Sequence, residues 1–202
     1  LFGVDKRAGG EIRLNGKDIS PRSPLDAVKK GMAYITESRR DNGFFPNFSI
    51  AQNIAISRSL KDGGYKGAMG LFHEVDEQRT AEAQRELLAL KCHSVNQNIT
   101  ELSGGNQQKV LISKWLCCHP EVIIFDEPTR GIDVGAKAEI YKVMRQLADD
   151  GKVILMVSSE LPEIITVCDR IAVFCEGRLT QILTNRDDMS EEEIMAWALP
   201  HE

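Results

Sequence analysis

The sequence predicts an α/β fold with a mainly parallel central sheet, an antiparallel β arm and a helical subdomain. The run Val122-Ile123-Ile124-Phe125 consists of large apolar residues, as in a fully buried parallel strand. Residues 81–90 are strong helix formers with apolar side chains on one side. Asn15-Gly16, between two short extended runs, is a strong signal for a tight antiparallel hairpin. These signals together favour an α/β domain over an all-α or all-β one.

The N-terminal section contains a clear helix start. Ser23 is a good capping residue, Pro24 suits the first helical position, and Asp26 is favoured by the helix dipole. The elements predicted for this section are strands over 11–14 and 17–19, a helix from 24 to about 30, and an extended run over 32–36.

The middle of the chain is predicted to be mostly helical. We assign residues 49–110 to a helical subdomain within a single domain that spans 1–202. It contains the helix over 81–90, and a further helix is predicted over 107–117. The glycine-rich stretch 61–67 is interpreted as a flexible insertion, and a partner-contacting loop is the alternative.

The C-terminal section predicts a strand, a helix, a closing hairpin and a last helix. Glu176-Gly177 separates the two apolar strands of the hairpin, 170–175 and 178–183. Ser190 and the glutamates after it have the spacing of a capping box, and a solvated first turn is favoured over a metal site there. Ser158-Ser159-Glu160, after the apolar run 153–157, can cap the helix that follows and runs toward Val167.

The composition of the chain argues against several classes of protein. The 202 residues carry a formal net charge of −5 and show no basic stripe, which gives no support for nucleic-acid binding. No apolar stretch approaches the length of a membrane span. The five cysteines have no CxxC spacing and no zinc-like pairing with histidines, so free buried thiols in a reducing compartment are expected.

The stretch Ser103-Gly104-Gly105 precedes the helix over 107–117. The first turn of a helix has unpaired backbone N–H groups and the positive end of the dipole, which suit a phosphate oxygen. Glycines let a ligand approach the backbone, and the Ser103 hydroxyl adds a donor. An ordinary serine cap after a glycine turn explains the same residues, and this stretch alone does not separate the two interpretations.

The strand over 122–125 ends in Asp126-Glu127. Ligands of open α/β sheets bind at the carboxyl ends of the strands, and adjacent carboxylates ending a buried strand are costly without a cation. Asp126 is therefore predicted to hold Mg²⁺, usually through water, and Glu127 to orient the water that attacks a terminal phosphate. The alternative is a solvated strand end.

The two motifs together resemble the signature loop and Walker B strand of ABC ATPases. The stretches that carry the resemblance are Leu102-Ser103-Gly104-Gly105-Asn106-Gln107-Gln108-Lys109, Asp126-Glu127-Pro128-Thr129 and Gly131-Ile132-Asp133. The last of these resembles the D-loop. The amino-acid sequence of residues 127–137 resembles that of the C-terminal half of the duplicated ATP-binding subunits of bacterial monosaccharide importers, of the ribose, galactose and allose type. The resemblance extends over nearly the whole chain.

This resemblance implies an ABC-type P-loop NTPase fold and the cofactors ATP and Mg²⁺. Nucleotide contacts fall to Ser103, Gly104, Gly105 and Asn106, which complete the ATP site of the other half, and to Asp133, which reaches across to it. A segment of the form GxxxxGK[ST] does not occur in the sequence, and the first residues resemble the stretch after the P-loop helix, so the chain is expected to be a fragment with little ATP affinity of its own.

Two positions depart from the family pattern. Glu37, a candidate for cofactor and Mg²⁺ binding, stands where most members carry the glutamine that contacts Mg²⁺ and links the site to the membrane partner, and a carboxylate can still ligate Mg²⁺. Ser159 stands at the catalytic position of the switch histidine, and serine cannot share a positive charge with the terminal phosphate. Hydrolysis is therefore expected mainly at the site of the other half.

The function implied by the resemblance is the ATPase portion of a sugar importer. Its partners are the N-terminal ABC half of the same polypeptide, membrane permease subunits and, indirectly, a periplasmic sugar-binding protein, at the cytoplasmic side of the bacterial inner membrane. The alternatives are a soluble ABC ATPase acting on ribosomes or DNA and a non-catalytic domain that only donates its signature loop. The aromatic cluster Phe44, Phe45, Pro46 and Phe48 can receive a permease helix, but a place in the core is preferred.

Overall fold

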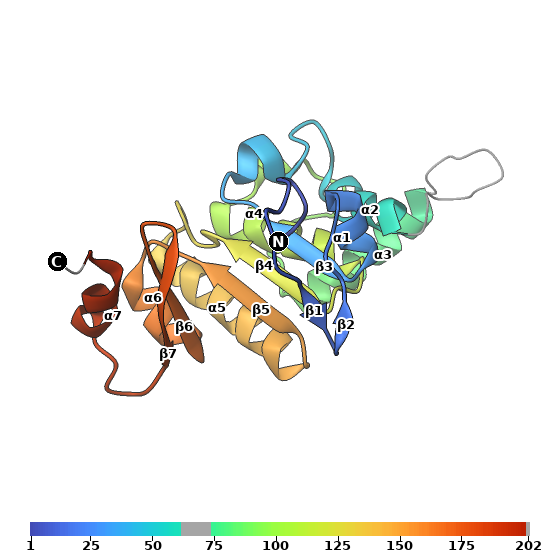
Figure 1. Cartoon of the computed structure of the whole chain (residues 1–202). Helices are drawn as coiled ribbons and strands as arrows, with labels where there is room; N and C mark the ends of the chain where they lie inside the picture. Colours follow the sequence, from blue (N-terminus) through green and yellow to red (C-terminus); the bar gives the residue numbers. More distant parts are fainter. Residues whose placement is uncertain (62–73, 201–202) are drawn as a thin grey trace. The chain divides into compact units, whose positions relative to one another are not determined.

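The computed structural model describes residues 1–61 and 74–200 (Figure 1). They form two compact units, Leu1–Leu155 and Met156–Glu202. Beyond Lys61, the predicted insertion at 61–67 lies outside the described residues. None of the helices in the described ranges is both long and apolar enough to cross a membrane.

The first unit contains both strands and helices, with β5 (Val153–Val157) continuing into the second unit. Its other elements are β1 (Arg13–Leu14), β2 (Lys17–Asp18), α1 (Pro24–Lys29), β3 (Met32–Ile35), the π-helix η1 (Arg39–Gly43), α2 (Ile50–Lys61), α3 (Glu74–Leu87), the 3-10 helix η2 (Ile99–Glu101), α4 (Gly104–Leu116), β4 (Val122–Asp126) and α5 (Val134–Asp149). The predicted α/β class is confirmed.

The antiparallel arm forms where the sequence predicts it. Strands β1 and β2 pair with Leu14 opposite Lys17. Asn15 and Gly16 both have positive φ, 51° and 77°, as a type I′ turn requires. The strands are shorter than predicted, but the Ile19 N–H still donates to the Ile12 carbonyl at 2.8 Å.

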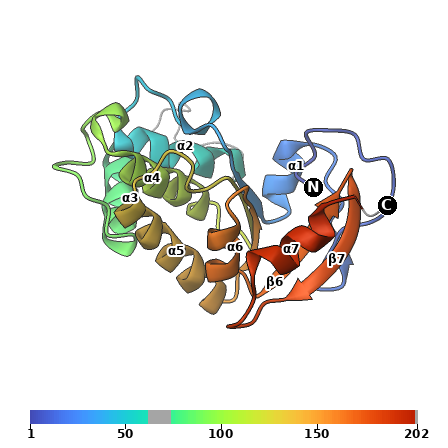
Figure 2. The ribbon, with the colours of Figure 1, turned by 90° about the vertical axis from the view of Figure 1, so that its left-hand side faces the viewer.

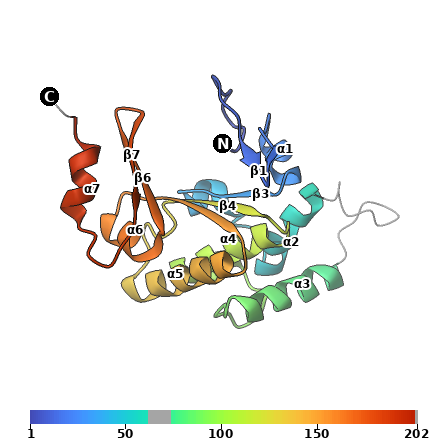
Figure 3. The ribbon, with the colours of Figure 1, turned by 60° about the horizontal axis from the view of Figure 1, so that its bottom comes forward.

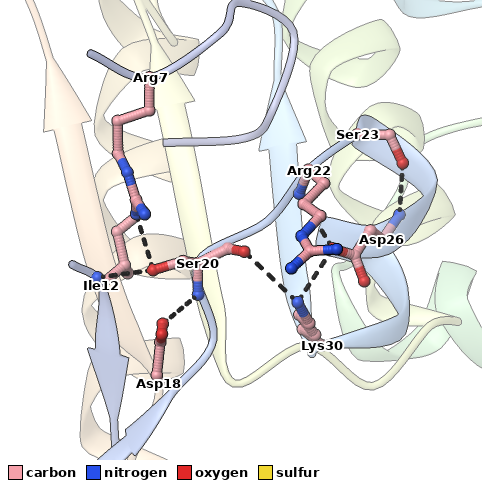
Figure 4. Close-up of polar contacts among 8 residues, drawn as sticks. All are labelled: Arg7, Ile12, Asp18, Ser20, Arg22, Ser23, Asp26 and Lys30. Carbon is pink, nitrogen blue, oxygen red and sulfur yellow. Dashed lines mark hydrogen bonds and ion pairs between the residues drawn. The ribbon is translucent and has the colours of Figure 1, made fainter. Parts of the chain in front are cut away.

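Helix α1 begins as predicted (Figure 4). The Asp26 N–H donates to the Ser23 hydroxyl at 3.2 Å, and Pro24 occupies the first turn. The Asp26 carboxylate also accepts from Lys30 Nζ at 2.9 Å, one turn along the helix. Lys30 Nζ in turn donates to the Ser20 carbonyl at 3.4 Å, so the end of the helix is tied back to the arm.

The central sheet has the strand order β3-β4-β5, and β3 and β4 are parallel. The pairing places Tyr34 beside Ile124 and Ile35 beside Phe125. Because alternate strand residues face opposite sides, the sheet needs a cover on each side. Helix α1 lies against one side of β3 and α4 against the other (Figure 3).

Helices α2, α3 and α4 pack together in the region predicted as the helical subdomain (Figure 2). Their shared apolar core contains Phe44, Ile50, Ile54, Ile99 and Leu111 among others. These large side chains come from helices and from the loops between them, and they hold α4, and with it the signature stretch at its start, in place.

Two helix boundaries in this region differ from the prediction. Helix α3 ends at Leu87 rather than at residue 90, because Ala89 has the left-handed φ of 46°, which no helix accommodates. Helix α4 begins at Gly104 rather than at Gln107. The two glycines of the signature stretch therefore lie inside the first helical turn, although glycine is a poor helix former.

The aromatic cluster before α2 divides into two parts. Phe44 is buried, as preferred from the sequence. Placement of Phe45 and Phe48 in the core was wrong, because they are 48% and 36% exposed and stack on each other with ring centroids 5.1 Å apart. Pro46 is exposed as well.

The second unit confirms the predicted hairpin and last helix. Its elements after β5 are α6 (Leu161–Val167), β6 (Arg170–Cys175), β7 (Arg178–Thr184) and α7 (Glu191–Ala198). Glu176 and Gly177 form the turn of the antiparallel pair with positive φ, 50° and 77°. The Glu193 N–H donates to the Ser190 hydroxyl at 3.2 Å, which is the predicted cap of α7. All five cysteines are free thiols, as expected, but only Cys117 and Cys118 are buried, and the other three are half-buried.

Candidate functional site

The carboxyl end of β4 presents Asp126 beside the neighbouring strand. The Tyr34 hydroxyl, on β3, donates to Asp126 Oδ2 at 2.5 Å. Burial, together with the hydrogen bond to this carboxylate, raises the pKa of Tyr34 to about 12. Tyr34 therefore stays neutral and supplies one hydrogen bond to Asp126, which partly offsets the cost of placing a carboxylate at the end of a buried strand.

Glu127 follows in a strained conformation. Its φ is +47°, in the left-handed region that residues other than glycine rarely adopt. The turn after it is closed by hydrogen bonds from the Arg130 N–H to the Glu127 carbonyl at 3.2 Å and from the Ile132 N–H to the Thr129 carbonyl at 3.1 Å. Strain of this kind persists only where the surroundings hold it, and it is concentrated at functional sites.

Glu37 lies just beyond β3 and forms an ion pair with Arg130. Glu37, Tyr34 and Asp126 line one cavity of about 540 Å³, together with Lys114 of α4. The structure therefore brings together the two carboxylates that the sequence predicted as Mg²⁺ ligands. It adds a partner for one of them, Arg130, which the sequence did not indicate.

The residues around this cavity are compatible with Mg²⁺. Carboxylate oxygens are its preferred protein ligands, and a nucleotide site commonly provides one or two of them while phosphates and water supply the rest. Tyr34 engages one of the two Asp126 oxygens, Oδ2. Within residues 1–61 and 74–200, no group of three or more His, Cys, Asp or Glu side chains has a metal-binding arrangement, so a cage built from protein ligands alone does not occur in these ranges.

The signature loop, residues 103–106, is held by the side chain of Asn106. Asn106 Nδ2 donates to the Ser103 hydroxyl at 2.9 Å, and Asn106 Oδ1 accepts from the Lys91 N–H at 2.9 Å. Ser103 occupies the N-cap position of α4, but its side chain makes no capping hydrogen bond. The ordinary serine cap considered from the sequence is thus absent, and the Ser103 hydroxyl retains its proton for donation.

The two glycines of the loop differ in their surroundings. A Cβ at Gly105 would lie 2.6 Å from the Cβ of Ala136 in α5, closer than any real contact of this kind. A Cβ at Gly104 would meet its nearest neighbours at 3.5 Å, an ordinary van der Waals distance. Gly105 is therefore required by the packing of α4 on α5, whereas the half-buried Gly104 could carry a Cβ at ordinary contact distance from Arg39 and Gly131.

Asp133 caps the helix that packs against α4. Its Oδ1 accepts from the Ala136 N–H at 2.9 Å, and the residue is exposed. The capping bond fixes one carboxylate oxygen beside the signature loop. The predicted reach of Asp133 to a facing nucleotide site stays a prediction.

Ser159 belongs to the second unit, between β5 and α6. The N-cap position of α6 is occupied by Glu160, whose N–H donates to the Ser158 hydroxyl at 2.9 Å. The Glu160 side chain itself makes no capping hydrogen bond to α6. The role of Ser159 toward a nucleotide stays a prediction.

Sequence reasoning missed Tyr34, Arg39 and Arg130. Arg39 donates to two backbone carbonyls of the segment after β4, and such acceptors have no sequence signature. The contact of Tyr34 could be predicted from the pairing of its strand with the strand that ends at Asp126, because the Tyr34 hydroxyl then has a carboxylate acceptor close by. Arg130 pairs with a residue far away in sequence, and no local pattern predicts such a contact.

The sequence of this chain is similar to a family profile and to curated proteins of known name. The profile of the family described as "ABC transporter" matches residues 1–130. The D-allose import ATP-binding protein AlsA of Escherichia coli (strain K12) is 98% identical over 202 residues, which are 100% of this chain and 40% of that protein. The ribose import ATP-binding protein RbsA of a Bacillus cereus strain is 44% identical over 98% of this chain and 39% of its own length.

Solved structures support the fold. The ATP-binding cassette MJ1267 of an ABC transporter matches with a TM-score of 0.78 at 19% identity, covering 97% of this chain and 79% of that chain. The ATP-binding cassette MJ0796, in a dimeric post-hydrolysis state bound to ADP and Pi, matches with a TM-score of 0.70 at 21% identity, over 91% of this chain and 76% of that one.

Proposed function

This chain belongs to the ABC transporter family, and from that premise we propose that it is the nucleotide-handling part of a bacterial sugar-import ATPase. The observation that carries the proposal is the identity of 98% to a D-allose import ATP-binding protein across all 202 residues. The chain spans 40% of that relative's length, so the activity proposed is that of a complete subunit containing it.

The proposed role of the signature loop is to bind the phosphates of ATP held by the N-terminal half. Helix α4 directs its first-turn N–H groups and dipole toward an incoming anion. Ser103 would add a hydroxyl donor, and Gly104 has no side chain to separate a phosphate from the backbone. Asn106 contributes by holding Ser103 in place, and Asp133 by its position at the start of α5.

The proposed role of the β4 end is Mg²⁺ binding and water activation. Asp126 and Glu37 would hold the ion from one cavity, and the ion would neutralise charge on the phosphates. Glu127 would orient the attacking water, and its strained backbone aims its side chain independently of the strand. With Glu37 and Ser159 in place of the usual glutamine and histidine, we propose that hydrolysis occurs mainly at the other half's site.

The proposed partners follow from the same assignment. They are an N-terminal ABC half in the same polypeptide, membrane permease subunits and a periplasmic sugar-binding protein. The exposed, stacked Phe45 and Phe48 offer an apolar contact for a permease helix. A subunit with these partners would lie at the cytoplasmic face of the inner membrane.

A chimera tests the proposal. This chain would replace the matching segment of the E. coli D-allose import protein, and the product would be assembled with its permease in proteoliposomes and supplied with the sugar-binding protein. We expect ATP-dependent D-allose uptake and ATP hydrolysis. Asp126→Asn should weaken Mg-ATP binding, whereas Asp149→Asn, an exposed carboxylate at the end of α5, serves as the matched control.

Replacing Glu127 by Gln tests the asymmetry of the two sites. We expect ATP binding to persist and turnover to fall much less than after the equivalent change in the N-terminal half. Equal losses would contradict the asymmetry. A well-folded chimera without any ATP turnover or uptake would contradict the proposed function itself.

A further inference from the structure

The π-helix η1 connects the strand that precedes Glu37 to the helical subdomain. Its C-terminal end is fixed on α4, because Lys114 Nζ donates to the Gly43 carbonyl. A Cβ at Gly43 would lie 3.0 Å from both Leu111 methyl carbons, so backbone and side chain are in close contact there. Burial lowers the pKa of Lys114 to about 8, which shows how far this contact is withdrawn from water.

The other end of η1 reaches the segment after β4. Arg39 Nη1 donates to the Arg130 carbonyl at 2.7 Å, and Nη2 donates to the Gly131 carbonyl at 3.3 Å. A planar guanidinium suits this task, because its fork can donate to two adjacent carbonyls at once. Arg39 is half-buried, and burial lowers the pKa of its guanidinium, whereas both hydrogen bonds to the turn lie at the exposed surface.

The same guanidinium lies against the signature loop. A Cβ at Gly104 would lie 3.5 Å from Arg39 Nη2 and 3.5 Å from the Gly131 carbonyl oxygen. Gly131 has a φ of +66°, a conformation that glycine adopts easily and leaves easily. Arg39 thus joins three segments: the one that begins at Glu37, the turn that leads to Asp133, and the signature loop.

We propose that Arg39 is a positioning residue for the nucleotide site of the other half, which holds the 130–131 turn against the signature loop and so fixes Gly104 and Asp133, the residues proposed to face that site. This inference rests on the proposed function, because it concerns the geometry in which these residues meet a nucleotide. Arg39 itself touches backbone carbonyls rather than the reacting atoms.

The test uses the chimera described above, with Arg39→Ala, Arg39→Lys and the control Arg40→Ala. Arg40 is the exposed next residue, and its replacement removes the same charge without touching the turn. We expect Arg39→Ala to reduce kcat for ATP hydrolysis on the order of tenfold or more, while KM for ATP changes little. The reason is that a shift of about 1 Å in the residues that contact the reacting phosphates is enough for such a loss. Arg39→Lys should recover part of the loss, and Arg40→Ala should match the unchanged chimera.

A second measurement is independent of catalysis. Amide hydrogen exchange in the 202-residue chain should accelerate over residues 130–137 in Arg39→Ala but not in Arg40→Ala. Unchanged exchange together with an unchanged kcat would overturn the proposal. A kcat loss that merely follows a lowered Tm would also overturn it, as an effect on stability alone. If the unchanged chimera has no turnover, the proposed function fails, and the exchange result decides whether Arg39 holds the turn.

Discussion

Replacing Gly105 by alanine tests whether this glycine serves packing. The added Cβ would lie 2.6 Å from the Cβ of Ala136 and 3.8 Å from a methyl of Ile132. Two carbon atoms prefer about 3.5–4.0 Å, so α4 and α5 must separate by about 1 Å. Neither Cβ can turn away, because both are fixed to their backbones.

The magnitude follows from two opposing effects. Overpacking of a well-packed contact typically costs about 1–3 kcal/mol. Alanine is favoured over glycine inside a helix by up to about 1 kcal/mol, which offsets part of that cost. We therefore expect a net loss of about 1–2 kcal/mol in the free energy of unfolding. For a chain of this size, each kcal/mol lowers Tm by about 2–4 °C.

Thermal unfolding followed by circular dichroism measures this effect, with Gly104→Ala as the matched control. The Cβ of that variant meets its neighbours at an ordinary 3.5 Å, so its Tm should change little. The double variant Gly105→Ala/Ala136→Gly removes the clash. Compared with Ala136→Gly alone, which itself costs up to about 1 kcal/mol as a glycine in α5, the double variant should be no less stable. If Gly105→Ala is as stable as Gly104→Ala, the close contact between α4 and α5 does not require glycine, and the packing argument is refuted.

Two predictions concern pH. Lys109 and Lys91 lower the pKa of Glu139 from 4.5 to about 2 through hydrogen bonds and charge. The ionised carboxylate therefore stabilises the folded chain above pH 4.5, and this stabilisation is lost as the pH falls from 4.5 to about 2. Glu139→Gln should therefore flatten the dependence of Tm on pH between 4.5 and about 2, and an unchanged slope would contradict this pairing. Because the pKa of Tyr34 is raised from 10.0 to about 12, the stability that it contributes below pH 10.0 is lost as the pH rises through that window. Tyr34→Phe should remove a step of tyrosinate absorbance near pH 12 from an alkaline titration, and loss of a step near pH 10 instead would contradict the effect of burial and of the hydrogen bond to Asp126.

Local signals in the sequence were sufficient for several elements. Asn15-Gly16 and Glu176-Gly177 adopt the positive φ angles that type I′ turns need, so each hairpin could be predicted from its turn. Ser23 and Ser190 both accept the predicted capping hydrogen bonds. The strand ending at Asp126 was also recognisable, because an unbroken apolar run followed by carboxylates is typical of a buried strand whose carboxyl end faces a ligand.

The features that could not be predicted from the sequence are two helix boundaries and the contacts of Arg39. The start of α4 was placed too late because glycine disfavours helices, whereas contact with α5 is what admits Gly105 there. The early end of α3 depends on the left-handed Ala89, which carries no glycine or asparagine signal. Arg39 was overlooked because its acceptors are carbonyls that lie 91 and 92 positions away along the chain.

The pairing of Glu37 with Arg130 changes how the departure at position 37 is understood. Taken alone, a second carboxylate facing the cavity of Asp126 adds negative charge and strengthens the attraction for a cation. Arg130 neutralises that charge in the structure, so Mg²⁺ must compete with the guanidinium for Glu37. Both side chains of the pair are largely exposed, and such a pair contributes only about 0–1 kcal/mol. On the proposed assignment of Glu37 to Mg²⁺, this weak ion pair would be a small obstacle to the binding of the divalent ion.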